Sequence, residues 1–350
     1  MSVKENLRKL LRKVDFANSK ILKIESKNIH DDEIEVITNF TFANTINELN
    51  LSKNKVSGRG MKLLSNSLMI KNLLKLDLSY NELVCKDLKR LVPDEKVIIY
   101  NLTDLILKNN KIACTGLNSL TSNKYFSNLR KLDLSYNELE DNGVYILKLN
   151  QDNLHCLRNL NIGSNQITIL GVQYLCASKL LTNLTNLNLS NNKNIKGEGI
   201  TKLANAQGCR KLEYLNLKNC EIDDLGFDCL LESDNFQNLK CLDVGENKIK
   251  LRSLKKLAAL ELNQLESLIH LSLSLNNINN NEVNKICESK LIHQLEYLNL
   301  SLNNIGNKGV DTFINSLKNN RILKINLLSN MEITDKKKKE LGNADIFIFK

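Results

Sequence analysis

The side chains of this chain whose types could perform chemistry are nine cysteines and four histidines. The histidines His30, His155, His270 and His293 are scattered and give no metal-ligand spacing. The cysteines are odd in number and include no Cys-x-x-Cys pair, which favours buried, reduced thiols over a disulfide framework. No acid–base pair or activated nucleophile stands out. We therefore expect no catalytic residue, no metal, no cofactor, and a reducing, cytoplasmic setting.

The elements that position these residues come from a repeated phrase, Leu-x-x-Leu-x-Leu-x-x-Asn-x-(Leu or Ile). It returns twelve times at intervals of 27 to 29 residues. Such regular self-similarity is typical of a solenoid. The asparagine slot of the phrase is occupied in turn by Lys27, Asn54, Asn81, Asn110, Asn137, Asn165, Asn192, Cys220, Asn247, Asn276, Asn303 and Asn330.

The phrase predicts a strand followed by a turn. Leu132 and Leu134 are two residues apart, so in an extended segment they share one face, while Lys131, Asp133 and Ser135 point to the other. Stacked strands of this kind form a parallel ladder with a continuous apolar interior. The asparagine amide can satisfy backbone groups that the stacking buries, and Cys220 can replace it as a weak thiol donor.

The second half of each repeat predicts a helix. Val310, Phe313, Ile314 and Leu317 follow the spacing of one buried helical stripe, and Met61, Leu64 and Leu68 do much the same. A glycine recurs after the asparagine slot, and we expect it to permit close packing on the adjacent coil. Its positions are Gly60, Gly116, Gly143, Gly171, Gly199, Gly226 and Gly309, and Asp87, Ser253 and Glu282 take the slot elsewhere.

The repeat length, the helical second half and the recurrent glycine resemble the ribonuclease-inhibitor-like class of leucine-rich repeats. Strands lie roughly 4.8 Å apart and helices roughly 8–10 Å apart, so such a stack bends with its strands inside. The resemblance implies an α/β horseshoe of about twelve repeats, with parallel strands on the concave face and helices on the convex face. It covers residues 19–333.

The two ends predict caps. Residues 1–18 form an expected capping helix with an apolar stripe of Leu7, Leu10, Leu11 and Val14, and a membrane-surface helix is the alternative. Residues 334–350 form the expected C-terminal cap. The N-terminus lacks the apolar stretch of a secretory signal, and no segment is long and apolar enough to span a membrane.

Function is expected on the outward positions of the strands, since extended binding sites form on the concave face of curved solenoids. The central row there is polar, and the next row is mostly small residues such as Ser79 and Ser135. Aromatic anchors concentrate interface energy, and exposed apolar rows indicate contact sites. The candidate partner-binding residues are Tyr80, Tyr136, Tyr214, Tyr297, Asp77, Asp133, Asp243, Lys108, Lys218, Leu275, Leu302 and Leu328.

These features predict a monomeric, non-enzymatic scaffold that binds a protein. The net charge of +10 favours an acidic partner, but the charge is spread along helices and there is no tryptophan, which argues against nucleic acid. Two alternatives are Ran-type GTPase activation, although the acidic tail of that family is absent here, and ribonuclease inhibition. The Lys/Asn/Ile-rich composition also resembles leucine-rich-repeat effectors that intracellular bacteria such as Legionella deliver into host cells without a classical signal peptide.

Overall fold

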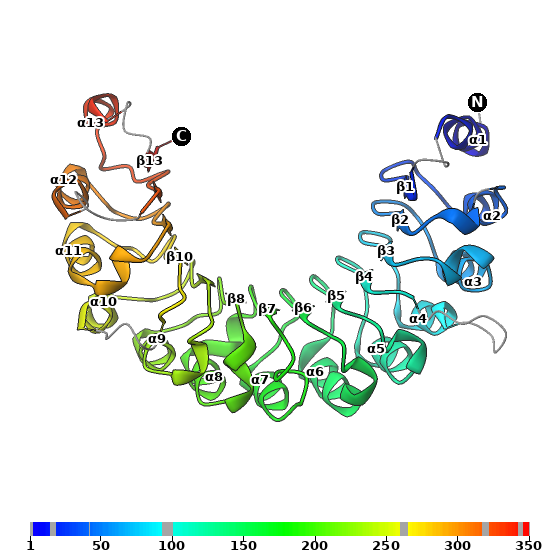
Figure 1. Ribbon diagram of the computed structural model, residues 1–350, viewed down its shortest axis with the longest axis horizontal. Coiled ribbons are helices and arrows are strands. Elements are labelled where there is room, and N and C mark those ends of the chain that lie inside the picture. Colours follow the sequence, from blue (N-terminus) through cyan, green and yellow to red (C-terminus); the bar gives the residue numbers. More distant parts are fainter. Residues whose placement is uncertain are drawn as a thin grey trace. The chain divides into compact units, whose positions relative to one another are not determined.

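The computed structural model describes residues 3–14, 19–41, 43–92, 101–259, 265–316, 322–341 and 346–349. Its contacts divide the chain into two units, Met1–Gln166 with Ala177–Asn183 (unit 1) and Ile167–Cys176 with Leu184–Lys350 (unit 2). Figure 1 shows that, within each unit, the strands line the inner side and the helices the outer side of the stack. Each unit is therefore a strand–helix solenoid.

The described residues of unit 1 form six strands that pair in parallel and in chain order, with partners 27 to 29 residues apart. The strands are β1 (Ile21–Lys23), β2 (Glu48–Asn50), β3 (Lys75–Asp77), β4 (Asp104–Ile106), β5 (Lys131–Asp133) and β6 (Asn159–Asn161). The helices are α1 (Val3–Lys13), α2 (Asp31–Thr38), α3 (Gly58–Ser65), α4 (Cys85–Leu91), α5 (Cys114–Thr121) and α6 (Glu140–Leu149).

Unit 2 follows the same plan, and its strands also pair in parallel. The strands are β7 (Asn186–Asn188), β8 (Tyr214–Asn216), β9 (Cys241–Asp243), β10 (His270–Ser272), β11 (Tyr297–Asn299), β12 (Lys324–Asn326) and β13 (Phe347–Ile348). The helices are α7 (Ile169–Cys176), α8 (Lys196–Ala204), α9 (Asp224–Leu231), α10 (Leu251–Ala259), α11 (Asn280–Glu288), α12 (Asn307–Ser316) and α13 (Asp335–Glu340).

The leucines of the phrase form the core, as predicted. Leu132 and Leu134 are both fully buried, while Lys131 and Asp133 are half-buried on the opposite face. The prediction that Ser135 also points outward is wrong, because this residue is buried. Ser135 lies beyond the three-residue strand β5, and its hydroxyl donates to Oδ1 of Asp133 at 2.7 Å instead of facing solvent.

The asparagine slot satisfies buried backbone groups across neighbouring repeats, which confirms its structural role. The amide nitrogen of Asn137 donates to the carbonyl oxygens of Leu107, one repeat earlier, and Leu134, at 3.0 and 2.9 Å. Its oxygen accepts the backbone N–H of Ile112 at 3.1 Å. Each such residue thus ties two coils together through groups that would otherwise be buried without partners.

Cys220 fills the same slot in unit 2 with a thiol. Its Sγ donates to the carbonyl oxygen of Leu189, with a sulfur–oxygen distance of 3.3 Å. Burial raises the pKa of Cys220 to about 12, so the thiol keeps the proton that it donates. A weak sulfur donor therefore replaces the amide donor of the other repeats.

Two of the recurrent glycines, Gly116 and Gly226, sit where helices of successive repeats approach closely, as predicted. A Cβ on Gly116 would lie 2.7 Å from the Cα of Cys85, and one on Gly226 would lie 2.5 Å from the Cα of Gly197. Backbone atoms cannot move aside easily, so a side chain at either position would separate the two coils. Gly116 and Gly226 are therefore packing residues.

Two details of the predicted helical stripes are wrong. Leu68 is exposed, because α3 ends at Ser65 and Leu68 lies in the short 3-10 turn that follows. Ile314 is half-buried on α12, whose described part ends at Ser316. Leu317 lies outside the described residues.

A side chain four residues after the slot caps the next repeat, which the sequence did not indicate. The carboxylate oxygen Oδ1 of Asp31 accepts the backbone N–H of Ser57, and that of Asp224 accepts the N–H of Lys250, each at 2.8 Å. Cys85 takes this position in its own repeat, and its Sγ accepts the N–H of Ala113 at 3.2 Å. Burial opposes ionisation of this thiol, but donors from the next repeat prevail and lower its pKa.

All nine cysteines are free. Cys209 and Cys220 are buried, whereas the other seven are half-buried, so the prediction of buried thiols holds for two of them. The half-buried thiols include Cys241 at the start of β9. Most of the cysteines are therefore not core residues.

The described residues at the two ends of the chain contact the neighbouring repeats. Leu7 and Leu11 of α1 are buried, and α1 lies beside α2 and the first repeat. Leu10 and Val14 of the same stripe are half-buried. At the other end, β13 pairs with β12, and the rings of Phe347 and Phe349 stack with centroids 6.0 Å apart.

Candidate functional site

The inner side of each unit presents two rows that carry the large candidate side chains. The strand-start row consists of the first residue of each strand, and the loop row consists of the residue before each asparagine slot. The loop row is Ser26, Lys53, Tyr80, Asn109, Tyr136 and Ser164 in unit 1, and Asn191, Asn219, Glu246, Leu275, Leu302 and Ser329 in unit 2. Every residue of the loop row has a φ between 50° and 59°. Left-handed backbone of this kind is uncommon outside glycine, so the row is a fixed feature of the coil.

The four candidate tyrosines divide between these two rows and do not form one set. Tyr80 and Tyr136 belong to the loop row and are 39% and 48% exposed. Tyr214 and Tyr297 begin β8 and β11 and are half-buried. The Tyr214 hydroxyl accepts a hydrogen bond from the Asn216 amide at 3.4 Å, and burial raises the pKa of Tyr214. Tyr214 therefore lies against its own strand.

Lys108 joins the two exposed tyrosines of unit 1 into one cluster. Its Nζ lies 5.9 Å from the ring centroid of Tyr80 and 5.1 Å from that of Tyr136. Both distances are in the range of a cation–π interaction, which orients the two rings. Within the described part of the chain, no carboxylate lies within 4.0 Å of Lys108. We call Tyr80, Lys108 and Tyr136 the tyrosine–lysine cluster.

The candidate aspartates brace the chain where it leaves the strands. The Oδ1 atom of Asp133 accepts the backbone N–H of Ser135 at 2.9 Å and its hydroxyl at 2.7 Å. Asp77 bonds to Ser79 in the same way, and Asp243 accepts the N–H of Gly245 at 2.9 Å. One oxygen of each carboxylate is thus engaged in holding the turn, which explains why small residues follow.

Lys218 occupies the position in unit 2 that Lys108 occupies in unit 1, but its charge is paired. The Nζ of Lys218 lies 2.7 Å from the Glu246 carboxylate, and Glu246 is the loop-row residue of the next repeat. A partner would have to compete with this carboxylate for the lysine. Of these two lysines, Lys108 is the one available to a partner's anion.

The candidate leucines lie together at the end of unit 2. Leu275 and Leu302 belong to the loop row, and the backbone N–H of Leu302 donates to the carbonyl oxygen of Leu328 at 2.8 Å. All three side chains are exposed, and Met331, which the sequence did not single out, is 89% exposed. Met331 directly follows the slot residue Asn330, so its position in the repeat could have identified it.

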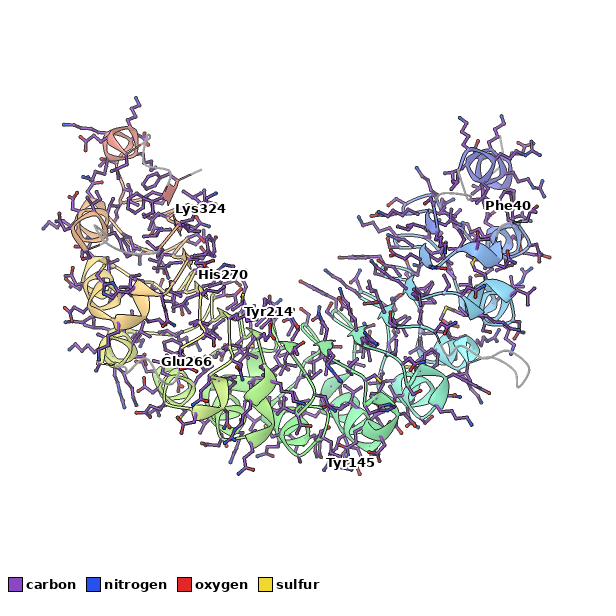
Figure 2. The ribbon with its side chains drawn as sticks, viewed as in Figure 1. Phe40, Tyr145, Tyr214, Glu266, His270 and Lys324 are labelled. Carbon is purple, nitrogen blue, oxygen red and sulfur yellow. The ribbon has the colours of Figure 1, made fainter. Side chains whose placement is uncertain are left out.

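A second group that the sequence missed lies in the strand-start row of unit 2. Cys241, His270 and Tyr297 are register partners in β9, β10 and β11. The Cys241 Sγ is 3.4 Å from the His270 Nδ1, and the His270 and Tyr297 rings meet edge-on at 5.9 Å. Burial raises the pKa of Cys241, which disfavours a thiolate. Figure 2 shows Tyr214, His270 and Lys324 on the inner side of unit 2.

Within the described residues, no group of three or more histidine, cysteine, aspartate or glutamate side chains is arranged to hold a metal ion. In the same part of the chain, no helix combines the length and apolar character needed to cross a membrane.

The fold and the repeats define a leucine-rich-repeat solenoid. Six segments match the family model described as Leucine Rich repeat, namely residues 43–65, 127–146, 153–176, 181–204, 208–231 and 293–313. They fall in both units, and each overlaps at least part of the strand–helix pattern described above. The chain therefore carries leucine-rich repeats.

Three proteins are similar to a part or to nearly all of this chain. Protein PAC2 of Saccharomyces cerevisiae is 30% identical over 158 residues, which are 43% of this chain and 28% of that protein. An internalin (inlF) of Listeria monocytogenes has a TM-score of 0.56 and 21% identity, covering 99% of this chain and 94% of that one. A chain of the Rad7 and Elc1 complex of yeast has a TM-score of 0.57 and 18% identity, covering 99% and 84%. These similarities to solved structures show the fold.

Proposed function

We propose that the chain is a monomeric, non-enzymatic scaffold that binds a protein partner through the inner side of its strands. The observation that carries the proposal is the tyrosine–lysine cluster of unit 1. Two exposed rings and one unpaired cation lie on a rigid, repetitive backbone. Preorganised aromatic side chains lose little conformational freedom on binding, which makes them effective interface anchors.

Two further features support the proposal. The exposed leucines and Met331 give unit 2 an apolar surface at its end, and contiguous apolar surface is characteristic of protein contact sites. The chain's fold is also that of a protein found in the Rad7 and Elc1 complex, so the same architecture occurs in a protein assembly. The remaining candidate residues Asp77, Asp133, Asp243, Lys218, Tyr214 and Tyr297 would then shape the surface around the anchors.

The test compares two changes of the same residue type. The variant Tyr80→Ala/Tyr136→Ala removes the two rings of the cluster, and Tyr145→Ala removes a ring of matching exposure, 39%, on α6 (Figure 2). Proteins captured from a lysate by the wild-type chain are quantified for each variant, alongside thermal unfolding. We expect partner capture to be lost with the double variant and kept with Tyr145→Ala. Equal capture by all three proteins would contradict the proposal.

The finer assignments are proposals with assays of their own. Repeats of 27 to 29 residues, each with a helix, support the ribonuclease-inhibitor-like class. GTPase activation is tested by single-turnover GTP hydrolysis with Ran, and ribonuclease inhibition by titration against a basic ribonuclease, for which the net charge of +10 is unfavourable. Delivery into a host cell is tested with a translocation reporter.

A further inference from the structure

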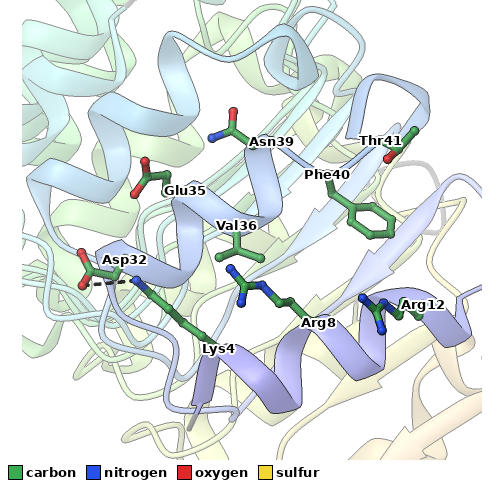
Figure 3. Close-up of a pocket in the computed structure, with 9 residues that line it drawn as sticks. All are labelled: Lys4, Arg8, Arg12, Asp32, Glu35, Val36, Asn39, Phe40 and Thr41. Carbon is green, nitrogen blue, oxygen red and sulfur yellow. Dashed lines mark ion pairs between the residues drawn. The ribbon is translucent and has the colours of Figure 1, made fainter.

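A groove between α1 and α2 in unit 1 has walls of two different kinds (Figure 3). One wall carries Lys4, Arg8 and Arg12 of α1. The other carries Val36 and Phe40, with polar residues around them. The groove has a volume of about 500 Å³ and is open to solvent. It is separate from the tyrosine–lysine cluster, so it concerns a second contact.

Among the described residues, two of the three cations on the α1 wall of the groove have no carboxylate within 4.0 Å. Its lining includes two carboxylates, Asp32 and Glu35, but Asp32 is already shared between Lys4 at 3.7 Å and Arg59 at 3.0 Å. Across the described residues, neither Arg8 nor Arg12 has a carboxylate within 4.0 Å. Guanidinium groups bind carboxylates through two parallel hydrogen bonds, so Arg8 and Arg12 can each bind one acidic side chain.

The spacing of the three cations matches an extended peptide. Lys4, Arg8 and Arg12 are four residues apart on one helix, and a rise of 1.5 Å per residue puts successive cations roughly 6 Å apart along the axis. Alternate side chains of an extended chain recur every ~6.6 Å on one face. Long, flexible arginine and lysine side chains absorb the small difference. A peptide with acidic residues at every second position could therefore pair with each cation in turn.

The opposite wall matches the intervening residues of such a peptide. Side chains of an extended chain alternate between two faces, so those not facing α1 would face Val36 and Phe40. Both of these residues are half-buried. Figure 3 shows Arg8 opposite Val36 and Arg12 near Phe40. Apolar side chains at the intervening positions would cover this wall.

A membrane surface fits the groove less well. A helix that lies on a membrane inserts its apolar face into the lipid. The apolar residues Leu7 and Leu11 of α1 are 3% and 1% exposed, because they pack on the first repeat. They cannot enter a bilayer while the helix stays in place, and this disfavours the membrane-surface alternative for α1.

From these observations we infer that the α1–α2 groove binds an extended acidic peptide segment of a partner protein. Glutamate or aspartate side chains at alternate positions pair with Lys4, Arg8 and Arg12. Apolar side chains at the positions between them contact Val36 and Phe40.

The test uses a fluorescein-labelled peptide of alternating glutamate and valine, and a second peptide of the same composition with the glutamates and valines in separate blocks. Fluorescence anisotropy with the full chain is expected to show binding of the alternating peptide, about tenfold tighter than the blocked peptide. This comparison uses only the wild-type protein, so it does not depend on how any variant folds. Equal affinity for the two peptides would overturn the inference, because it would show charge attraction without registry.

Matched variants locate the contact. Arg8→Ala/Arg12→Ala is expected to weaken binding of the alternating peptide about tenfold, and Val36→Ser/Phe40→Ser is expected to weaken it as well. Lys9→Ala/Lys13→Ala removes the same charge from the same helix and should change affinity less than about twofold. Equal weakening by the two charge variants would overturn the inference. The inference would also be overturned if the chain did not bind the peptide but bound vesicles of anionic lipid, or a single-stranded oligonucleotide, through Arg8 and Arg12.

Discussion

The loop rows of units 1 and 2 share one backbone and differ in what they present. Tyr80 and Tyr136 in unit 1 have the same left-handed φ, 56°, and Leu275 and Leu302 in unit 2 have φ values of 50° and 58°. Each of these residues also donates its backbone N–H to a carbonyl oxygen in the next repeat, at 2.8 to 3.0 Å. In unit 1 the side chains are rings held by a lysine, and in unit 2 they are exposed aliphatic chains.

This comparison separates what builds the coil from what the coil displays. At Tyr80, Tyr136, Leu275 and Leu302 the loop row is held by backbone hydrogen bonds, by the slot asparagine and, in the tyrosine repeats, by the preceding aspartate, and none of these bonds uses the displayed side chain. Stability and recognition should therefore respond to different substitutions. The following predictions test that separation.

The largest effect is expected from the slot asparagines, which both units share. Asn137→Ala in unit 1 and Asn247→Ala in unit 2 each leave several buried backbone groups without a hydrogen-bond partner. Each substitution should lower the free energy of unfolding by about 2–3 kcal/mol. Urea unfolding measures both. A loss below about 1 kcal/mol in either unit would mean that the asparagine ladder is not what holds that unit's coils together.

The next effect concerns Cys220, where the ladder of unit 2 contains a thiol. Its pKa is raised to about 12 in the folded chain from an ordinary value of 9.0, so the unfolded chain loses the proton first as the pH rises. Stability is therefore retained below pH 9 and lost between pH 9 and pH 12. Cys220→Asn should remove this loss. The difference in the free energy of unfolding between the variant and the wild type should therefore shift by about 1.4 kcal/mol in favour of the variant from pH 7 to pH 10.

Urea unfolding of both proteins at the two pH values checks this prediction. Tyrosines and lysines that titrate in the same range are common to both proteins and cancel in the difference. Parallel pH dependence of wild type and variant would show that Cys220 ionises in the folded chain as readily as in the unfolded one.

A smaller effect is expected from Lys218, which differs from Lys108 in having a carboxylate partner. Lys218→Ala removes the ion pair between Lys218 and Glu246. Both side chains of this pair are partly exposed, so the loss of stability should stay below about 1 kcal/mol. The loss should disappear in about 1 M salt, where such pairs are screened. A loss that persists at high salt would instead indicate packing of the lysine stem.

The smallest effect is expected when the unit 2 surface is changed without its backbone. Leu275→Ser/Leu302→Ser changes two surface side chains, which are 42% and 48% exposed, and should shift the free energy of unfolding by less than about 0.5 kcal/mol. Affinity for a partner bound at the tyrosine–lysine cluster should also be unchanged. A clear drop in that affinity would mean that one partner contacts both surfaces.

The repeat predicted the parts of the fold that every coil shares. Leu132 and Leu134, the slot asparagines and the glycines at 116 and 226 behave as their spacing indicated, because burial and backbone hydrogen bonding constrain them in the same way in each repeat. The period of two misplaces Ser135, because its hydroxyl bonds to Asp133 and the residue is buried.

The surface was harder to predict because it depends on which repeat positions are neighbours. Tyr80 and Tyr214 were grouped by residue type, although one precedes the slot by one residue and the other by six. Cys241 and His270 both precede their slots by six residues, so register alone could have placed them side by side. The cation–π contacts of Lys108 depend on side-chain conformation, which spacing does not specify.

The most direct test gives unit 1 the loop-row side chains of unit 2. Tyr80→Leu/Tyr136→Leu keeps the backbone and its hydrogen bonds and replaces only the displayed rings. The affinity of the captured partner and the free energy of unfolding are measured on the same preparation. We expect the dissociation constant to rise at least about tenfold, with stability unchanged within about 0.5 kcal/mol. An unchanged dissociation constant, or a loss of affinity that follows a loss of stability, would contradict the separation of scaffold and surface.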